Sequence, residues 1–346
     1  MKLYAITIRP LSGFGTSLKG DTIFGQFCWE VAQDSALVDS DLEQCLEIYE
    51  QTPFVIFSSA FPATSEQSTQ KWYALKKPDL PSHYLWKDNA GDSYTKVALR
   101  KERKKQKWML SGPDLKVSTS GDTYISDGEL AAKFASDKVG RSISAHSSKE
   151  GKFLVSHYPQ PHNTINRLTN TTGTGAFAPY SQEITFYNGN ICLVIFALLD
   201  EIHTNINNVV DGLTRIGNFG YGKDASIGIG RFTVTDYTEI HRAQNGDVNA
   251  VYCLGPCVPE RGSYSEAFFM PFARFGKHGN SLAQSTNPFK NPVIMADDGA
   301  VFLPKNSDDL HKYFFGSAVT GVSKIMPQTV TQGYSITIPF KLEAPK

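Results

Sequence analysis

The chain has 346 residues, and its 34 lysines and arginines balance 34 aspartates and glutamates, so the formal net charge is zero. This balance excludes a global basic field, and any nucleic-acid site must therefore be local. Hydrophobic residues make up 40% of the chain, which excludes a disordered protein and, with the length, suggests about two domains.

The N-terminal sixty residues alternate between strand and helix patterns. Lys2–Arg9 is rich in β-forming residues and predicts a strand. After a glycine-rich turn, Asp21 is suited to cap a helix whose apolar stripe follows at helical spacing. A second helix over Asp41–Gln51 and a short apolar strand at Phe54–Phe57 complete an α+β opening.

Between about residues 62 and 158 the apolar period is lost, which indicates a long loop-rich insertion. Within it, residues 96–107 carry seven basic residues and one acidic residue. Such a run is either a solvated helix face or loop, or a basic finger that follows a polyanion. The finger's candidate RNA contacts are Arg100, Lys101, Arg103, Lys104, Lys105 and Lys107.

The second half of the chain begins with a hairpin signal. Asn188-Gly189 separates two strand-like runs, 183–187 and 191–199, and a helix is predicted over His203–Arg215. The next part, residues 217–230, is the glycine segment, and it leads into a predicted strand at Arg231–Tyr237. Further strand-like runs are Phe268–Arg274, Val301–Leu303 and Gly333–Phe340.

This order predicts an α+β protein of two tandem ferredoxin-like (RRM-type) domains, each with a helix crossing a mostly antiparallel sheet. We expect an N-terminal domain over 1–180 that contains the insertion at about 62–158. The C-terminal domain is expected over 181–346 and contains the glycine segment.

Cysteine usage and the N-terminus bear on the compartment. The five cysteines are odd in number and lack a framework spacing, which fits reduced thiols. Cys253 and Cys257 form a lone CxxxC, which favours two ordinary thiols near a turn over zinc. The N-terminus lacks a signal peptide's apolar core, and no window approaches the ~20 apolar residues of a membrane span. We therefore expect a cytoplasmic protein with no metal, no cofactor and no membrane contact.

The glycine segment holds five glycines in fourteen residues beside Lys223. It fits the first seven positions of a GxxxxGK phosphate loop, but Asp224 stands where Ser or Thr must bind magnesium. The segment also follows a helix and precedes a strand, which is the reverse of a P-loop, so we reject a nucleotide hydrolase. What remains is a backbone nest for an anion, or a structural loop with bulges at Gly228 and Gly230.

The glycine segment's last part, GKDASIGIGRF, resembles the signature loop of the RAMP superfamily of CRISPR effector complexes. Of five further stretches, HNTINRLTNTTGTGAF resembles another segment of the family, and the other four resemble the member that binds the 5′ handle of the guide RNA in type III-A (Csm) complexes. The five stretches are GTSLKGDTIFGQFCW, HNTINRLTNTTGTGAF, FARFGKHGN, NPVIMADDGAVF and QGYSITIPF, and together they span nearly the whole chain outside the insertion.

The resemblance implies two ferredoxin-like domains that face each other and grip the guide RNA without catalysis. It also implies partners in antiviral defence, namely CRISPR RNA, a polymerase-like large subunit and backbone RAMP subunits. A hairpin extension of such proteins wedges the guide where the handle meets the spacer.

RNA ends are held by backbone contacts, cations and base stacking, and the sequence offers groups of each kind. Phe219 and Tyr221 either stack on bases or anchor the glycine segment in the core, and Arg167 has a surface salt bridge as its ordinary alternative. The expected RNA-binding residues are Lys19, His162, Asn163, Arg167, Gly217, Gly220, Tyr221, Gly222, Lys223, Ser226 and Arg274.

A catalytic alternative rests on two neighbouring histidines. His157 and His162 lie near Arg167 in the sequence, and a general base beside a phosphate-binding arginine suits a metal-independent endoribonuclease that processes precursor CRISPR RNA. Against it, the first loop holds no histidine and no histidine pair has helical spacing. We therefore predict no catalytic residues and keep the ribonuclease as the alternative.

Overall fold

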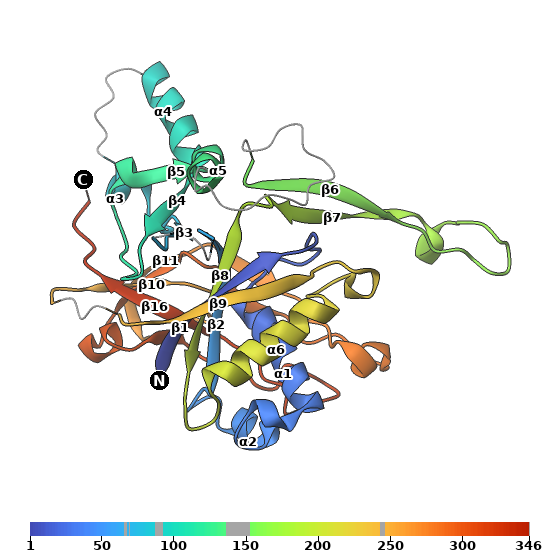
Figure 1. Cartoon of the computed structure of the whole chain (residues 1–346). Helices are drawn as coiled ribbons and strands as arrows, with labels where there is room; N and C mark the ends of the chain where they lie inside the picture. The colour runs from blue at the N-terminus through green and yellow to red at the C-terminus, as the bar shows by residue number, and fades with distance from the viewer. Residues whose placement is uncertain (66–67, 69, 87–92, 136–152, 243–245, 346) are drawn as a thin grey trace.

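A seven-stranded antiparallel sheet, in the order β5-β4-β3-β2-β8-β1-β9, forms the centre of the computed structural model (Figure 1). The structure describes residues 1–345 apart from 66–67, 69, 87–92, 136–152 and 243–245. The strands of this sheet are β1 (Lys2–Pro10), β2 (Val55–Ala63), β3 (Tyr73–Lys76), β4 (Gln106–Ser111), β5 (Tyr124–Ser126), β8 (Cys192–Leu199) and β9 (Phe232–Ile240).

Four of these strands and two helices make one ferredoxin-like unit. The chain runs β1, α1 (Gly20–Gln33), β2, then β8, α6 (Ile206–Phe219) and β9, and the strand order is β9-β1-β8-β2. Short helical pieces at Ser35–Leu37 and α2 (Leu42–Glu47) follow α1. We call this ferredoxin-like part of the chain the first unit.

The expected division at residue 180 cuts through this unit, so the boundary is corrected. β8 pairs with β1 along Lys2–Ile8 and also with β2, although both partners precede it by more than a hundred residues. The reason lies in β8 itself, because all eight of its residues are buried. A strand that is apolar on both faces belongs in the middle of a covered sheet.

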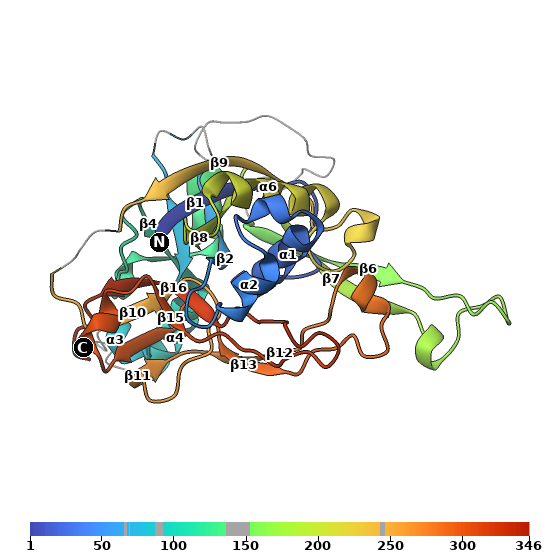
Figure 2. The same ribbon diagram turned by 90° about the horizontal axis from the view of Figure 1, so that it is seen from below.

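The hairpin predicted around Asn188-Gly189 is wrong for the same reason. The strand before it, β7 (Tyr180–Tyr187), pairs with β6 (Val155–His162), while β8 enters the central sheet. The β6–β7 ladder projects from the molecule, and residues 163–179 lie at its far end (Figures 1 and 2). We call this ladder the hairpin and residues 163–179 its tip.

The insertion is more regular than its sequence suggests. β3, β4 and β5 extend the central sheet by antiparallel pairing. The insertion also contains α3 (Ser82–Leu85), α4 (Ser93–Lys105) and α5 (Asp127–Ala135), and part of it, residues 136–152, lies outside the described residues. These strands have three to six residues, which is too short for alternation to reveal them.

The rest of the chain forms the second unit, a five-stranded antiparallel sheet in the order β11-β14-β10-β16-β15. A separate two-stranded ladder joins β12 to β13. The strands are β10 (Ala250–Cys253), β11 (Tyr264–Phe268), β12 (Pro271–Arg274), β13 (Val293–Ala296), β14 (Val301–Pro304), β15 (Phe314–Gly316) and β16 (Tyr334–Phe340).

The second unit repeats the strand succession of the first, since β16-β10-β14-β11 corresponds to β9-β1-β8-β2. Its crossover connections, 254–263 and 305–333, are fully described and contain no α-helix; the second holds only a 3₁₀ turn at Ser307–Leu310 and β15. The α+β class with antiparallel sheets is therefore confirmed, whereas two complete ferredoxin-like domains are not.

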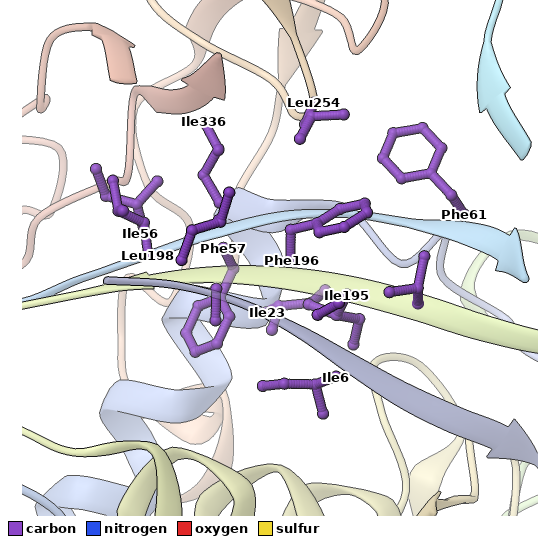
Figure 3. Close-up of a cluster of buried hydrophobic side chains, with 14 of the residues drawn as sticks. Ile6, Ile23, Ile56, Phe57, Phe61, Ile195, Phe196, Leu198, Leu254 and Ile336 are labelled. Atoms are coloured by element: carbon purple, nitrogen blue, oxygen red, sulfur yellow. The ribbon is translucent and has the colours of Figure 1, made fainter. Parts of the chain in front are cut away.

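The two units share one hydrophobic core around the central sheet (Figure 3). On one face of the sheet, Ile56 and Leu198 point toward Ile336 of β16. On the other face, Phe57 packs against Phe27 of α1, with ring centroids 5.5 Å apart. The sheet is therefore covered by helices on one side and by the second unit on the other.

A buried amide bridges the units where the β2 ladder is irregular. The pairing of β2 with β8 shifts register between Phe57 and Ala60. The fully buried Gln332 accepts from the Phe57 N–H at 2.9 Å and donates to the Phe57 carbonyl at 2.8 Å. Its side chain thus gives both backbone groups of Phe57 a hydrogen-bond partner.

Candidate RNA interface

Three segments meet at one end of the central sheet. The loop between β1 and α1, residues 11–19, pairs with the hairpin, since Phe14 and Thr185 exchange backbone hydrogen bonds of 2.8 and 2.9 Å. The same loop accepts a bond from the glycine segment, where the Gly230 N–H donates to the Gly13 carbonyl at 2.7 Å. The first loop therefore connects the hairpin to the glycine segment.

The glycine segment is packed mainly against the chain itself. Gly230 has a φ of +79°, and a Cβ at this position would overlap the main chain of Tyr221. Cβ atoms on the other predicted glycines would also collide with protein atoms, at Phe232 for Gly217, Ile229 for Gly220 and Thr16 for Gly222. These glycines are thus required by internal packing, as in the structural-loop alternative.

Tyr221 anchors the glycine segment in the core. Its side chain is 1% exposed, and its hydroxyl donates to the Ser17 carbonyl at 2.9 Å. Burial raises the pKa of this hydroxyl well above its ordinary value. The expected stacking of Tyr221 on RNA is corrected, because its ring is covered, whereas Phe219 is 74% exposed.

Lys19 is engaged in an ion-pair network between the units. Its ammonium lies 2.7 Å from Asp297 and also contacts Asp298, both in the turn before β14. Burial lowers the pKa of Lys19, but the charges of Asp298 and Asp297 outweigh burial and hold it above its usual value. Its expected role as an RNA contact is therefore corrected to a structural one.

Arg274 has the same kind of role. Its guanidinium binds Asp21 of α1 through two hydrogen bonds of 2.6 and 2.9 Å, and the Asp21 side chain is 3% exposed. Such a bidentate pair fixes both partners in geometry and charge. Arg274 therefore connects β12 to α1. Its expected role as an RNA contact is corrected to a structural one, as for Lys19.

The remaining predicted residues are on the surface. Lys223 and Ser226 are exposed on the glycine segment, and Asn163 and Arg167 are exposed on the hairpin tip. Among the described residues, neither Lys223 nor Arg167 has a side-chain partner, so both charges are available to a ligand. The exposed apolar side chains beside them are Ile165, Leu168, Phe219 and Ile227.

His162 connects the hairpin to the glycine segment. Its Nε2 lies 3.4 Å from Oδ2 of Asp224, and its ring stacks on Tyr180 with centroids 5.0 Å apart. Both facing atoms are buried, and neither has a hydrogen-bond partner among the described residues. Sequence reasoning used Asp224 only to reject a P-loop and so missed this contact.

The two histidines of the catalytic alternative do not converge. His157 lies near Glu183 at 3.3 Å and near the Thr185 hydroxyl at 3.2 Å, and its side chain is half exposed. An odd spacing of five residues along a strand places His157 and His162 on opposite faces. The geometry therefore does not bring His157 to the His162–Asp224 contact.

The basic run does not form one surface. Arg100, Lys101, Lys104 and Lys105 are exposed on α4, which lies apart from the glycine segment in both views (Figures 1 and 2). The Arg103 guanidinium lies over the ring of Trp86 at 5.2 Å, and Lys107 pairs with Asp127 at 2.7 Å. The basic run thus divides between the exposed face of α4 and Lys107 of β4.

Groups of three or more histidine, cysteine or acidic residues that would hold a metal ion are absent from the described part of the chain. In the same residues, no helix combines the length and apolar character that crossing a membrane requires.

No protein-family profile and no curated protein sequence matches the chain. Solved structures do match it. A chain from the crystal structure of the Csm3–Csm4 subcomplex in the type III-A CRISPR-Cas interference complex aligns with a TM-score of 0.57 and 14% identity, covering 99% of this chain and 100% of that one.

Chains from crystal structures of the Csm1–Csm4 cassette match as well. The complex with pppApA gives a TM-score of 0.52 at 13% identity, and the complex with AMPPNP gives 0.52 at 14%, each covering 100% of both chains. The chain thus shares its fold, over its full length, with subunits of these complexes. Csm4 is the subunit common to both kinds of complex, and the chain is similar in fold to it, which confirms the resemblance at the level of the fold.

Proposed function

We propose that this chain is a non-catalytic subunit of a type III CRISPR effector complex and holds the 5′ repeat-derived handle of the guide RNA. The observation that carries the proposal is the convergence of the hairpin, the first loop and the glycine segment, with Lys223 exposed beside this junction and Arg167 exposed farther out on the hairpin tip. This convergence occurs in a fold shared with Csm4-containing complexes over the full chain.

The fold also supports the finer architecture. We infer that the second unit is a ferredoxin-like domain whose two crossover helices have been replaced by loops, because its strand succession matches that of the first unit. The matched structures pair Csm4 with Csm3 or with Csm1, so the proposed partners are a backbone RAMP subunit and the large subunit.

The chemistry of the surface suits a static grip on RNA. Exposed lysine and arginine neutralise phosphates, and exposed apolar side chains provide platforms for bases. Because the Tyr221 ring is buried and the Cβ positions of four of the five glycines face protein atoms, contact is assigned to the outer residues of the glycine segment and to the hairpin tip. Precursor RNA is expected to stay intact, with or without His162→Ala.

A binding measurement tests this assignment on the full chain. The probe is a fluorescent guide RNA with its constant 5′ segment, and the competitor is the same RNA without that segment. We expect Lys223→Gln with Arg167→Gln to weaken binding ~10-fold and to reduce the salt slope by about 1.4, since each lost phosphate contact contributes roughly 0.7.

The matched control is Lys305→Gln with Lys324→Gln, which removes the same charge from exposed positions of the second unit. The control should bind like the unmodified chain. Equal affinity of the test and control variants, or equal binding of RNA that lacks the 5′ segment, contradicts the proposal.

A further inference from the structure

A cleft of about 90 Å³ opens between α1 and loops of the second unit, and none of the predicted RNA-binding residues lines it. Ile23, Phe24, Phe27 and Val31 form the face of α1 that is buried. Another face lines the cleft at helical spacing, opposite side chains of α2 and of the second unit. The lining residues are Gly25, Cys28, Trp29, Ala32, Leu42, Leu46, His278, Lys290, Met326, Gln328, Thr329 and Val330.

Lys290 brings a positive charge to this mostly apolar cleft. Among the described residues, no carboxylate lies within ion-pair distance of its ammonium. The charge of Asp21 acts on it, but that carboxylate is already bound by Arg274 through two hydrogen bonds. Burial lowers the pKa of Lys290, as expected for a cation whose water has been removed without a matching anion.

Two further residues that line the cleft carry polar side chains. The Thr329 hydroxyl oxygen is buried and has no hydrogen-bond partner among the described residues. A buried hydroxyl without a partner is uncommon in native proteins, and a ligand acceptor would satisfy it. His278 is already engaged, because its Nε2 lies 2.7 Å from the Ser323 hydroxyl and burial lowers its pKa.

We propose that the cleft binds a carboxylate carried on a short apolar stem, with the Lys290 ammonium and the Thr329 hydroxyl as its donors. The stem lies against Trp29, Ala32 and the leucines of α2. Apolar walls with a few placed polar groups are typical of ligand sites, and a charge-assisted bond to Lys290 supplies the orientation. The same chemistry is found in a free short-chain acid and in a glutamate side chain of a neighbouring protein.

The test compares butyrate with butyramide, which have the same shape but differ in charge, by ligand-observed NMR on the full chain. We expect butyrate to bind at least ~10-fold more tightly, and Lys290→Met to abolish the preference. Thr329→Val should reduce it while removing only the hydroxyl, and this variant preserves the test if Lys290→Met does not fold. Lys324→Met, an exposed lysine outside the cleft, is the matched control.

A second arm separates the two sources. N-acetylglutamate N-methylamide is compared with its glutamine counterpart; a preference for the glutamate compound identifies a protein side chain, and binding of butyrate alone identifies a free acid. The proposal is overturned if butyrate shows no saturable binding at ~10 mM, if butyramide binds equally, or if both cleft variants keep the preference.

Discussion

Lys19 and Arg274 are largely buried in ion pairs between the two units, whereas Lys223 and Arg167 are exposed on the glycine segment and the hairpin tip. All four cations lie in or near segments that the sequence predicts to bind RNA. What separates them is the presence of carboxylates, which come from distant parts of the chain: Asp21 is 253 positions from Arg274. The comparison teaches that a cation near a predicted site is available to a ligand only if the fold leaves it without an internal anion.

The largest effect is expected from Arg274→Ala. This change leaves the Asp21 carboxylate buried without its two hydrogen bonds, and removing one partner of a buried pair costs about 3–5 kcal/mol. Urea denaturation of the full chain measures the change in the free energy of unfolding. Arg167→Ala on the exposed tip is the control and should stay within about 0.5 kcal/mol.

If Arg274→Ala lowered the free energy of unfolding by less than about 1 kcal/mol, the buried and exposed arginines would contribute similarly to stability, and the distinction between them would be wrong. Arg274→Lys sharpens the test, because lysine keeps the charge but not the two-pronged geometry. Its stability should therefore lie between those of the unmodified chain and Arg274→Ala.

Gly230→Ala and Gly228→Ala compare the packed and open parts of the glycine segment. A Cβ on Gly230 meets the Tyr221 main chain at positive φ, so we expect a loss of about 3 kcal/mol. Gly228 also has positive φ, but no atom lies within 4 Å of the position of its Cβ, and only the conformational cost of about 1 kcal/mol remains. Thermal unfolding measures both, and equal losses would show that the segment is packed uniformly.

Local patterns predicted much of the first unit. β1, α1, α6 and β9 form where the alternation and the helical stripes place them, within a few residues of the expected ends. Strand pairing was harder to predict from the sequence. Asn188-Gly189 favours a local hairpin, whereas the wholly apolar β8 is buried between β1 and β2. The local residue pattern does not indicate which distant strands will pair with β8.

In the candidate site, the exposed residues were predicted correctly as surface residues and the buried ones were not. Exposed Lys223, Ser226, Asn163 and Arg167 are where a loop prediction expects them. Tyr221 was assigned to RNA because an aromatic residue beside glycines suits both a stacking platform and a core anchor. Lys19 and Arg274 were assigned to RNA because their carboxylate partners are far away in the sequence. Burial decides between the two roles of Tyr221. Its burial depends on contacts with the Ser17 carbonyl and the Phe14 ring, both in the first loop.

Tyr221→Phe is expected to have a small effect on stability, similar to that of Gly228→Ala, and it tests whether the glycine segment is anchored by internal contacts. The substitution keeps the buried ring and removes only the hydroxyl, so the Ser17 carbonyl loses one donor at 2.9 Å and keeps the Lys19 N–H, also at 2.9 Å. One neutral hydrogen bond in a buried setting contributes about 1 kcal/mol, so the unfolding midpoint in urea should fall modestly. Affinity for the guide RNA should not change, because the hydroxyl faces the first loop and not the solvent. A loss of RNA affinity at unchanged stability would place Tyr221 with Lys223 and Arg167 as a direct contact.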